Sequence, residues 1–251
     1  MRIKYIVPVP LDESGLANRR AQLPAGLRSP NVDYDFVAVK NSCLNADGPY
    51  EALLMDAYVT EAGVASEEEG YDAVVMDSVS DSGLAALRSR LTIPVVGPGQ
   101  VQQHVAAILG KRFSILTMWP RWKHLYEKTL SDYGTTHYCA SIRSIDTRPD
   151  HANLLGGKED VVFPKLVEQG RRAIEDDGAD IILMGSTTMY QAVDHLRRVL
   201  RVPVINPGPL AIKMAELFVN LGLSHSKLAY MAPEVVQDEK FHSLMAARAE
   251  S

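Results

Sequence analysis

Residues 72–99 read DAVVMDSVSDSGLAALRSRLTIPVVGPG, and residues 180–208 read DIILMGSTTMYQAVDHLRRVLRVPVINPG. Each copy starts with Asp, continues through an apolar run that ends in Met, and has a Ser six positions after the Asp. An amphipathic stretch follows in each copy, and then a Pro-led apolar pair and a Pro-Gly turn. This order of segments is typical of a βαβ unit. Two copies with matching internal spacing indicate a duplication and a pseudo-twofold molecule.

The rest of the chain continues the same alternation of short apolar runs and longer amphipathic stretches. Several apolar runs are β-branched and bounded by Gly, Pro or Asp, as buried parallel strands usually are. We expect strands at 3–9, 34–39, 73–76, 95–96, 113–117, 181–184 and 204–205, and helices at 48–69, 81–90, 99–110, 120–133, 160–177, 188–200 and 208–221. The pattern predicts an α/β fold of two pseudo-symmetric, flavodoxin-like βα halves, with parallel sheets and a cleft between them. The expected halves are 1–97 with 208–251, and 98–207.

Composition narrows the classes of partner. The 251 residues are 46% hydrophobic and 23% charged with a formal net charge of −5, so no nucleic-acid footprint is indicated and a small-molecule substrate is expected. No apolar stretch reaches membrane-spanning length. Cys43 and Cys139 are far apart and no secretion signal is evident, which favours reduced thiols in a cytoplasmic protein. The histidines show no metal-ligand spacing and no dinucleotide or nucleotide glycine motif occurs, so we expect neither a metal nor a cofactor.

The repeat also marks the candidate site. Ser78 and Ser186 each fall just past the carboxyl end of a predicted strand and just before a helix. Ligands of open α/β sheets bind there, beside helix N-termini whose free N–H groups favour anions. The pseudo-twofold would place both serines across one cleft, where one face of a substrate carbon could lose a proton and the other gain one. In the alternative interpretation, both serines only cap the helices that follow.

Four segments resemble the aspartate/glutamate/hydantoin racemase superfamily, and within it the hydantoin/allantoin racemases. YDAVVMDSVSDSGLAALRSRLTIPVVGPGQ (71–100) is similar to the pattern in which a catalytic cysteine stands at the position of Ser78. GADIILMGSTTM (178–189) is similar to the second cysteine site, at Ser186, and 109–117 and 203–227 follow the family in the same order. The resemblance implies a cofactor-independent isomerase that acts on a carbon next to a carbonyl, in a small cyclic or carboxylated substrate. It also implies a homo-oligomer.

The departures from that family concern its chemistry. Its two cysteines act as paired acid and base, and a thiol suits this because its pKa of about 8.5 can be tuned towards neutrality. Serine is a far weaker acid that needs an adjacent base, so serine at both positions implies that the two-thiol mechanism is lost. The alternatives are a hydrolase, lyase or decarboxylase on a related ring or amide, or an inert relative that binds a small molecule.

Two further departures lie close to the first serine and in the first loop. Where the family has an Asn-Pro-Asn-Ser/Thr turn that holds a substrate carboxylate, this chain has Val7-Pro8-Val9-Pro10, so side-chain donors are missing beside Pro8. Asp77, directly before Ser78, is a candidate general base, because a desolvated carboxylate takes up a proton more readily. The alternative for Asp77 is a helix cap, a role for which Asp81 competes.

The remaining candidates are substrate-binding residues. Ser186, Thr187 and Thr188 bring hydroxyls and successive amides to a helix start, which is a good cradle for a carbonyl or carboxylate oxygen. One of two tryptophans, Trp119 or Trp122, could line the cleft, and we expect Trp119. The other expected binding residues are Val79 and Ser80 in the loop after Ser78, Thr117 at a strand end, and Tyr190, whose phenol could act as a weak acid.

Overall fold

The computed structural model describes residues 1–43, 45–150 and 154–246. Within them the strands form two parallel sheets, which confirms the predicted α/β fold class. The first sheet has the order β2-β1-β3-β4, with β1 at Arg2–Val7, β2 at Asp33–Ala38, β3 at Ala73–Met76 and β4 at Val95–Val96. The second has the order β6-β5-β7-β8, with β5 at Phe113–Thr117, β6 at Cys139–Ser144, β7 at Ile181–Met184 and β8 at Val204–Ile205.

The helices lie where the amphipathic stretches were expected, with some differences at their ends. They are α2 (Pro49–Gly63), α3 (Leu84–Arg90), α4 (Pro98–Leu109), α5 (Lys123–Asp132), α6 (Glu159–Glu175), α7 (Val193–Leu200) and α8 (Pro207–Asn220). The helix expected at 188–200 begins as a 3₁₀ helix, η4 (Thr187–Ala192), and only then becomes α7. The chain also has α1 (Glu13–Arg20), α9 (Asp238–Ala246) and β6, which the sequence did not predict.

The sequence repeat is reproduced in the hydrogen bonds of the two sheets. The amide of Asp77 donates to the carbonyl of Ile6 at 2.8 Å, and the amide of Gly185 donates to that of Leu116 at 2.7 Å. Further along each copy, the guanidinium of an arginine donates to the carbonyl of the edge strand, Arg88 to Val95 at 3.0 Å and Arg197 to Val204 at 3.1 Å. Position 77 therefore corresponds to position 185, and Ser78 to Ser186.

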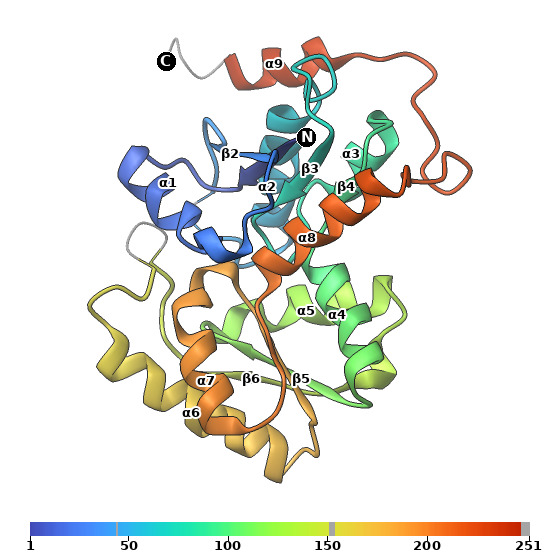
Figure 1. Cartoon of the computed structure of the whole chain (residues 1–251). Coiled ribbons are helices and arrows are strands. Elements are labelled where there is room, and N and C mark those ends of the chain that lie inside the picture. The colour runs from blue at the N-terminus through green and yellow to red at the C-terminus, as the bar shows by residue number, and fades with distance from the viewer. Residues whose placement is uncertain (44, 151–153, 247–251) are drawn as a thin grey trace.

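Two helices connect the sheets by crossing over. α4 follows β4 of the first sheet but contacts β5 and β7 of the second, while α8 follows β8 but contacts β3 and β4 of the first. α4 and α8 also contact each other, and Figure 1 shows α8 lying diagonally at the junction of the two sheets. The division of the chain into the predicted halves stays a prediction, and residues 247–251 of the first half lie outside the described part.

Burial explains why these runs form strands. All four residues of β3 and all four of β7 are buried, as expected for parallel strands covered by helices on both faces. A continuous cluster of buried apolar side chains extends from the helices of the first sheet to those of the second. None of the helices in the described part of the chain has the length and apolar character needed to cross a membrane.

Candidate functional site

A cavity of about 70 Å³ lies where the loops after β3 and β7 meet. Both predicted serines line it, which places the two copies of the repeat at one site. The lining residues are Pro8, Val9, Arg19, Ala46, Met55, Asp77, Ser78, Val79, Ser80, Trp122, Leu125, Tyr126, Gly185, Ser186, Thr187 and Thr188.

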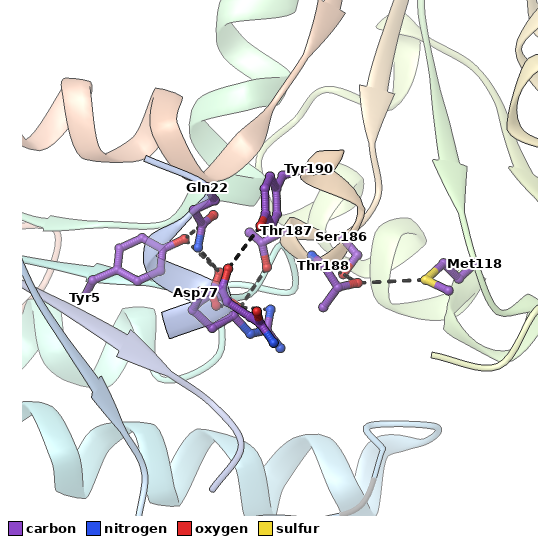
Figure 2. Close-up of polar contacts among 10 residues, drawn as sticks. Tyr5, Gln22, Asp77, Met118, Ser186, Thr187, Thr188 and Tyr190 are labelled. Carbon is purple, nitrogen blue, oxygen red and sulfur yellow. Dashed lines mark hydrogen bonds and ion pairs between the residues drawn. The ribbon is translucent and has the colours of Figure 1, made fainter. Parts of the chain in front are cut away.

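Each copy of the repeat contributes a pair of hydrogen-bonded hydroxyls to this cavity. The Oγ atoms of Ser78 and Ser80 lie 2.5 Å apart. In the second copy, Ser186 Oγ and Thr188 Oγ1 lie 2.7 Å apart, and Figure 2 shows this pair beside Thr187. The pairs occupy corresponding positions, so the duplication has placed matched hydroxyls on two sides of one cavity.

The two serines differ in their relation to the helices that follow. Ser186 is the N-cap of η4, and its Oγ accepts from the amide of Thr188 at 3.2 Å. Gly83, at a φ of 74°, occupies the N-cap of α3, so Ser78 has no equivalent capping role. Capping therefore accounts for the hydroxyl of Ser186 in part and leaves that of Ser78 unexplained.

Asp77 is part of a buried polar network. Its carboxylate lies 3.2 Å from Nη1 of Arg19, and the two side chains are 0% and 3% exposed. Asp77 Oδ1 accepts two hydrogen bonds, as Figure 2 shows. Tyr5 donates to it at 2.7 Å, and Gln22 Nε2 donates to it at 3.4 Å. Burial together with the negative charge of Asp77 raises the pKa of Tyr5 well above its usual range. The expected general base is thus a carboxylate that is held in an ion pair, and its role in catalysis stays a prediction.

Asp81 is a cap, but for a helix other than the one that follows it. Its carboxylate accepts from the amides of Gly99 at 2.8 Å and Gln100 at 2.7 Å, in the first turn of α4, and from the phenol of Tyr133 at 2.7 Å. Burial raises the pKa of Asp81 to about 6. This residue therefore ties the loop after Ser78 to the crossover helix.

Three of the predicted binding residues do not line the cavity. Thr117 is fully buried and its hydroxyl lies 2.9 Å from the phenol of Tyr126. Trp119 lies partly exposed, with the guanidinium of Arg148 5.3 Å from its ring centroid. Tyr190 donates to the carbonyl of Asn18 at 3.2 Å (Figure 2), and burial raises the pKa of its phenol.

Several lining residues were not predicted. Trp122, not Trp119, is the tryptophan at the cavity, because Trp119 precedes the short helical turn that carries Trp122 inward. Within the described residues, the buried Nε1 of Trp122 has no hydrogen-bond acceptor. Tyr126 of α5 donates to the carbonyl of Gly185 at 2.5 Å, and burial raises the pKa of this phenol above its usual range. Arg19 was missed because the mostly polar run ESGLANRR did not predict the helix α1, on which Arg19 lies.

The chemical character of the lining is simple. Arg19 and Asp77 are its charged side chains, and they pair with each other. Among the described lining residues there is no cysteine, histidine or lysine. Cys43 and Cys139 lie elsewhere, and burial raises the pKa of each thiol, that of Cys139 to about 11. Acid–base chemistry in this cavity therefore depends on hydroxyls and on the carboxylate of Asp77.

Comparison with known proteins gives consistent results. The model of the family described as Asp/Glu/Hydantoin racemase matches residues 28–215. The chain is 33% identical over 237 residues to a hydantoin racemase of Pseudomonas sp. (strain NS671), covering 93% of this chain and 92% of that one. It is 34% identical over 191 residues to a hydantoin racemase of Rhizobium meliloti, covering 75% and 77%. The solved allantoin racemase from Klebsiella pneumoniae is similar with a TM-score of 0.85 and 30% identity, over 94% of this chain and 95% of that one.

Proposed function

The chain belongs to the Asp/Glu/hydantoin racemase family and is an enzyme, and we propose that it is a cofactor-independent isomerase acting on a carbon next to a carbonyl without the two-thiol mechanism. The observation that carries this proposal is the pair of matched hydroxyl groups at one cavity, Ser78 with Ser80 and Ser186 with Thr188. We place Ser78 and Ser186 where the family has its catalytic cysteines. The hydroxyls keep the polarity of those positions and lose the acidity of a thiol.

The chemistry that hydroxyl pairs support best is stabilisation of an enolate-like intermediate. When a proton leaves the carbon, negative charge develops on the neighbouring carbonyl oxygen. Donors that are already in place stabilise that charge without further reorganisation. Ser186, Thr187 and Thr188 supply such hydroxyl donors at the start of η4.

The charges of the cavity favour a substrate that is neutral overall. The positive charge of Arg19 is balanced by Asp77 at 3.2 Å, so the lining carries no net charge. Much of the remaining wall is apolar, including Val9, Met55 and Leu125. A small ring with amide groups, of the hydantoin type on which the named relatives act, satisfies both conditions.

Proton NMR in D₂O tests the proposal. The enzyme is incubated with a panel of hydantoins, allantoin, amino acids, malonates and small unsaturated acids, and deuterium is expected at the carbon next to a carbonyl in the ring compounds. The variants Ser78→Ala and Ser186→Ala should lose about 10²–10³-fold of that rate, as is usual when a preorganised donor is removed. Ser131→Ala is the matched control, because Ser131 is exposed on α5 and does not line the cavity.

Two other results would count against an isomerase. New product signals without deuterium exchange would identify a hydrolase or lyase. Ligand-induced stabilisation with neither exchange nor products, across the whole panel, would identify a protein that binds its ligand and does not turn it over.

A further inference from the structure

The hydroxyls of Ser78 and Ser80 lie on one tight turn. We call residues 78–81 the Ser78 turn, and the amide of Asp81 closes it by donating to the carbonyl of Ser78 at 3.0 Å. Asp81 has a φ of 54°, which is uncommon for a residue other than glycine. The Oγ atoms of Ser78 and Ser80 lie 2.5 Å apart, so the placing of this pair depends on the shape of the turn.

The side chain of Asp81 holds the Ser78 turn against the start of α4. Its carboxylate accepts from the amides of Gly99 at 2.8 Å and Gln100 at 2.7 Å. The fit is close, because a Cβ added at Gly97 would lie 2.5 Å from Cγ of Asp81, and one added at Gly99 would lie 2.2 Å from the carbonyl oxygen of Val79. The turn and the helix therefore touch at two points, the carboxylate of Asp81 and the carbonyl of Val79.

This contact connects the two sides of the cavity. Ser78 follows β3 of the first sheet, whereas α4 contacts β5 and β7 of the second sheet, as Figure 1 shows. Ser186 follows β7. The carboxylate of Asp81 therefore fixes Ser78 relative to a helix that packs on the sheet of Ser186.

The second copy of the repeat has the same turn without a charge. The amide of Met189 donates to the carbonyl of Ser186 at 3.2 Å, as that of Asp81 does to Ser78. Met189 is 0% exposed, and its thioether is a weak acceptor that carries no charge. A titratable group thus fixes the hydroxyl pair on the Ser78 side, and an apolar side chain stands in its place on the Ser186 side.

We propose that Asp81 is a positioning residue whose ionised carboxylate holds the hydroxyls of Ser78 and Ser80 in the arrangement that the reaction needs. This proposal rests on the proposed function. Asp81 is not among the residues that line the cavity, so it acts through the Ser78 turn and not on the substrate. A misplacement of about 1 Å can cost about 10²-fold in rate, so a loosened turn lowers catalysis without unfolding the protein.

The titration of Asp81 makes this role dependent on pH. Burial raises the pKa of its carboxyl to about 6. A neutral carboxyl makes weaker hydrogen bonds to the amides of α4 and loses its attraction to the positive end of the helix. The exchange rate should therefore rise with pH through about 6. The free energy of unfolding moves in the opposite direction, because the folded state binds this proton more tightly than the unfolded state does.

Other charged and titratable groups surround Asp81. They are Tyr133 after α5, Arg88 of α3, Lys128 and Asp132 of α5, Asp56 of α2, Tyr230 after α8, and His104 of α4, whose ring lies beside that of Tyr133. Arg88 donates to Val95 and Tyr230, Lys128 pairs with Asp132, and Asp56 accepts from Gly83. An imidazole can change its charge near neutrality, so the tests include a variant of His104.

The first test is the pH profile of deuterium exchange by the wild type and Asp81→Asn, with Asp180→Asn as the matched control. Asn keeps the size of Asp and cannot ionise, so kcat for exchange should be about 10²-fold lower above pH 6, with little change in KM and no rise through that pH. Asp180 also accepts from two successive amides, those of Lys111 at 2.9 Å and Arg112 at 3.0 Å. It precedes β7, whereas the cavity lies after that strand, so its variant should keep the rate and the profile of the wild type.

The second test moves the rise in rate to another pH. Tyr133→Phe keeps the ring and removes the hydroxyl that donates to Asp81 at 2.7 Å, a bond that lowers the pKa of Asp81. The rise should shift by about 1–2 units towards higher pH, as expected for the loss of one hydrogen bond to a charged group. This variant decides the question if Asp81→Asn does not fold, as judged by circular dichroism. His104→Gln should leave the rise where it is.

The outcomes separate the positioning role from the function on which it rests. Exchange by the wild type that is flat through pH 6, or a rise that persists in Asp81→Asn and does not move in Tyr133→Phe, overturns the role of Asp81 and leaves the isomerase intact. A rise that disappears in His104→Gln assigns the titration to the imidazole and also overturns it. An equal loss of exchange in Asp180→Asn would trace the effect to stability. A wild type that exchanges no compound of the panel overturns both proposals.

Discussion

Replacing Asp77 by Asn should destabilise the protein strongly, because it removes the carboxylate that forms a buried ion pair with Arg19. The two side chains are 3.2 Å apart and at most 3% exposed. Removing one partner of such a buried pair costs about 3–5 kcal/mol. For a chain of about 150–250 residues, each kcal/mol lowers Tm by about 2–4 °C, so Asp77→Asn should lower it by about 6–20 °C.

A second substitution should recover most of that loss. In the double variant Arg19→Met with Asp77→Asn, no charge remains to be buried, and Asn can still accept from Tyr5, which donates to Asp77 at 2.7 Å. Apolar or neutral replacements of both partners of a buried pair are often neutral in stability. The double variant should therefore be more stable than Asp77→Asn alone.

Urea unfolding followed by circular dichroism measures the free energies of the wild type, both single variants and the double variant. The difference between the double variant and the sum of the singles gives the coupling between the two side chains. A coupling below about 0.5 kcal/mol, within the error of additivity for independent sites, would refute the ion pair as the reason for the burial of Arg19. A stable Asp77→Asn that has lost only deuterium exchange would instead support the original expectation that Asp77 is the base.

Three further predictions concern the framework around the site. Gly99→Ala should lower the free energy of unfolding by about 1–3 kcal/mol, because the added Cβ would lie 2.2 Å from the carbonyl oxygen of Val79. Urea unfolding measures this loss. Gly26→Ala is the control, because nothing lies within 4 Å of a Cβ added there. Burial raises the pKa of Asp81 from 3.8 to about 6, so the folded state binds the proton of this carboxyl more tightly than the unfolded state does. The free energy of unfolding should therefore fall as pH rises from 3.8 to about 6. This dependence on pH should be weaker in Asp81→Asn. Lys227→Met should lower the free energy of unfolding by about 1.5–3 kcal/mol, because the ammonium donates to three carbonyls at the end of α3. The segment after α8 should also become more sensitive to protease. An unchanged rate of cleavage would contradict this prediction.

The elements that the sequence predicted well are those whose burial is complete. β3 and β7 are continuous apolar runs, each preceded by Asp and followed by Asp or Gly, so their bounds in the structure are the predicted ones. β6 was missed because each of its residues is only partly buried, and CASIRS lacks the apolar pattern of a central strand. α1 was missed because ESGLANRR is mostly polar, although Asp12 caps it by accepting from the amide of Gly15.

The predicted site divides in the same way. Residues of the loops that follow β3 and β7 line the cavity as expected, because the carboxyl end of a parallel strand fixes where the next residues lie. Residues expected from their nearness in sequence to a strand end, Thr117 and Trp119, do not line it. The direction of their side chains depends on the backbone of the short 3₁₀ helix η2 (Pro120–Trp122) and on the packing of Tyr126, neither of which a motif specifies.

The sequence alone determined the duplication, the α/β class and the positions of the two serines, because all three follow from the spacing of residues along one repeat. The tertiary structure decided which groups from elsewhere in the chain meet those serines. Arg19 reaches Asp77 from α1, and this contact spans a long separation in sequence. Local patterns fix local backbone geometry, whereas contacts of this kind arise only when the crossover helices and the sheets pack together, and these contacts set the chemistry of the site.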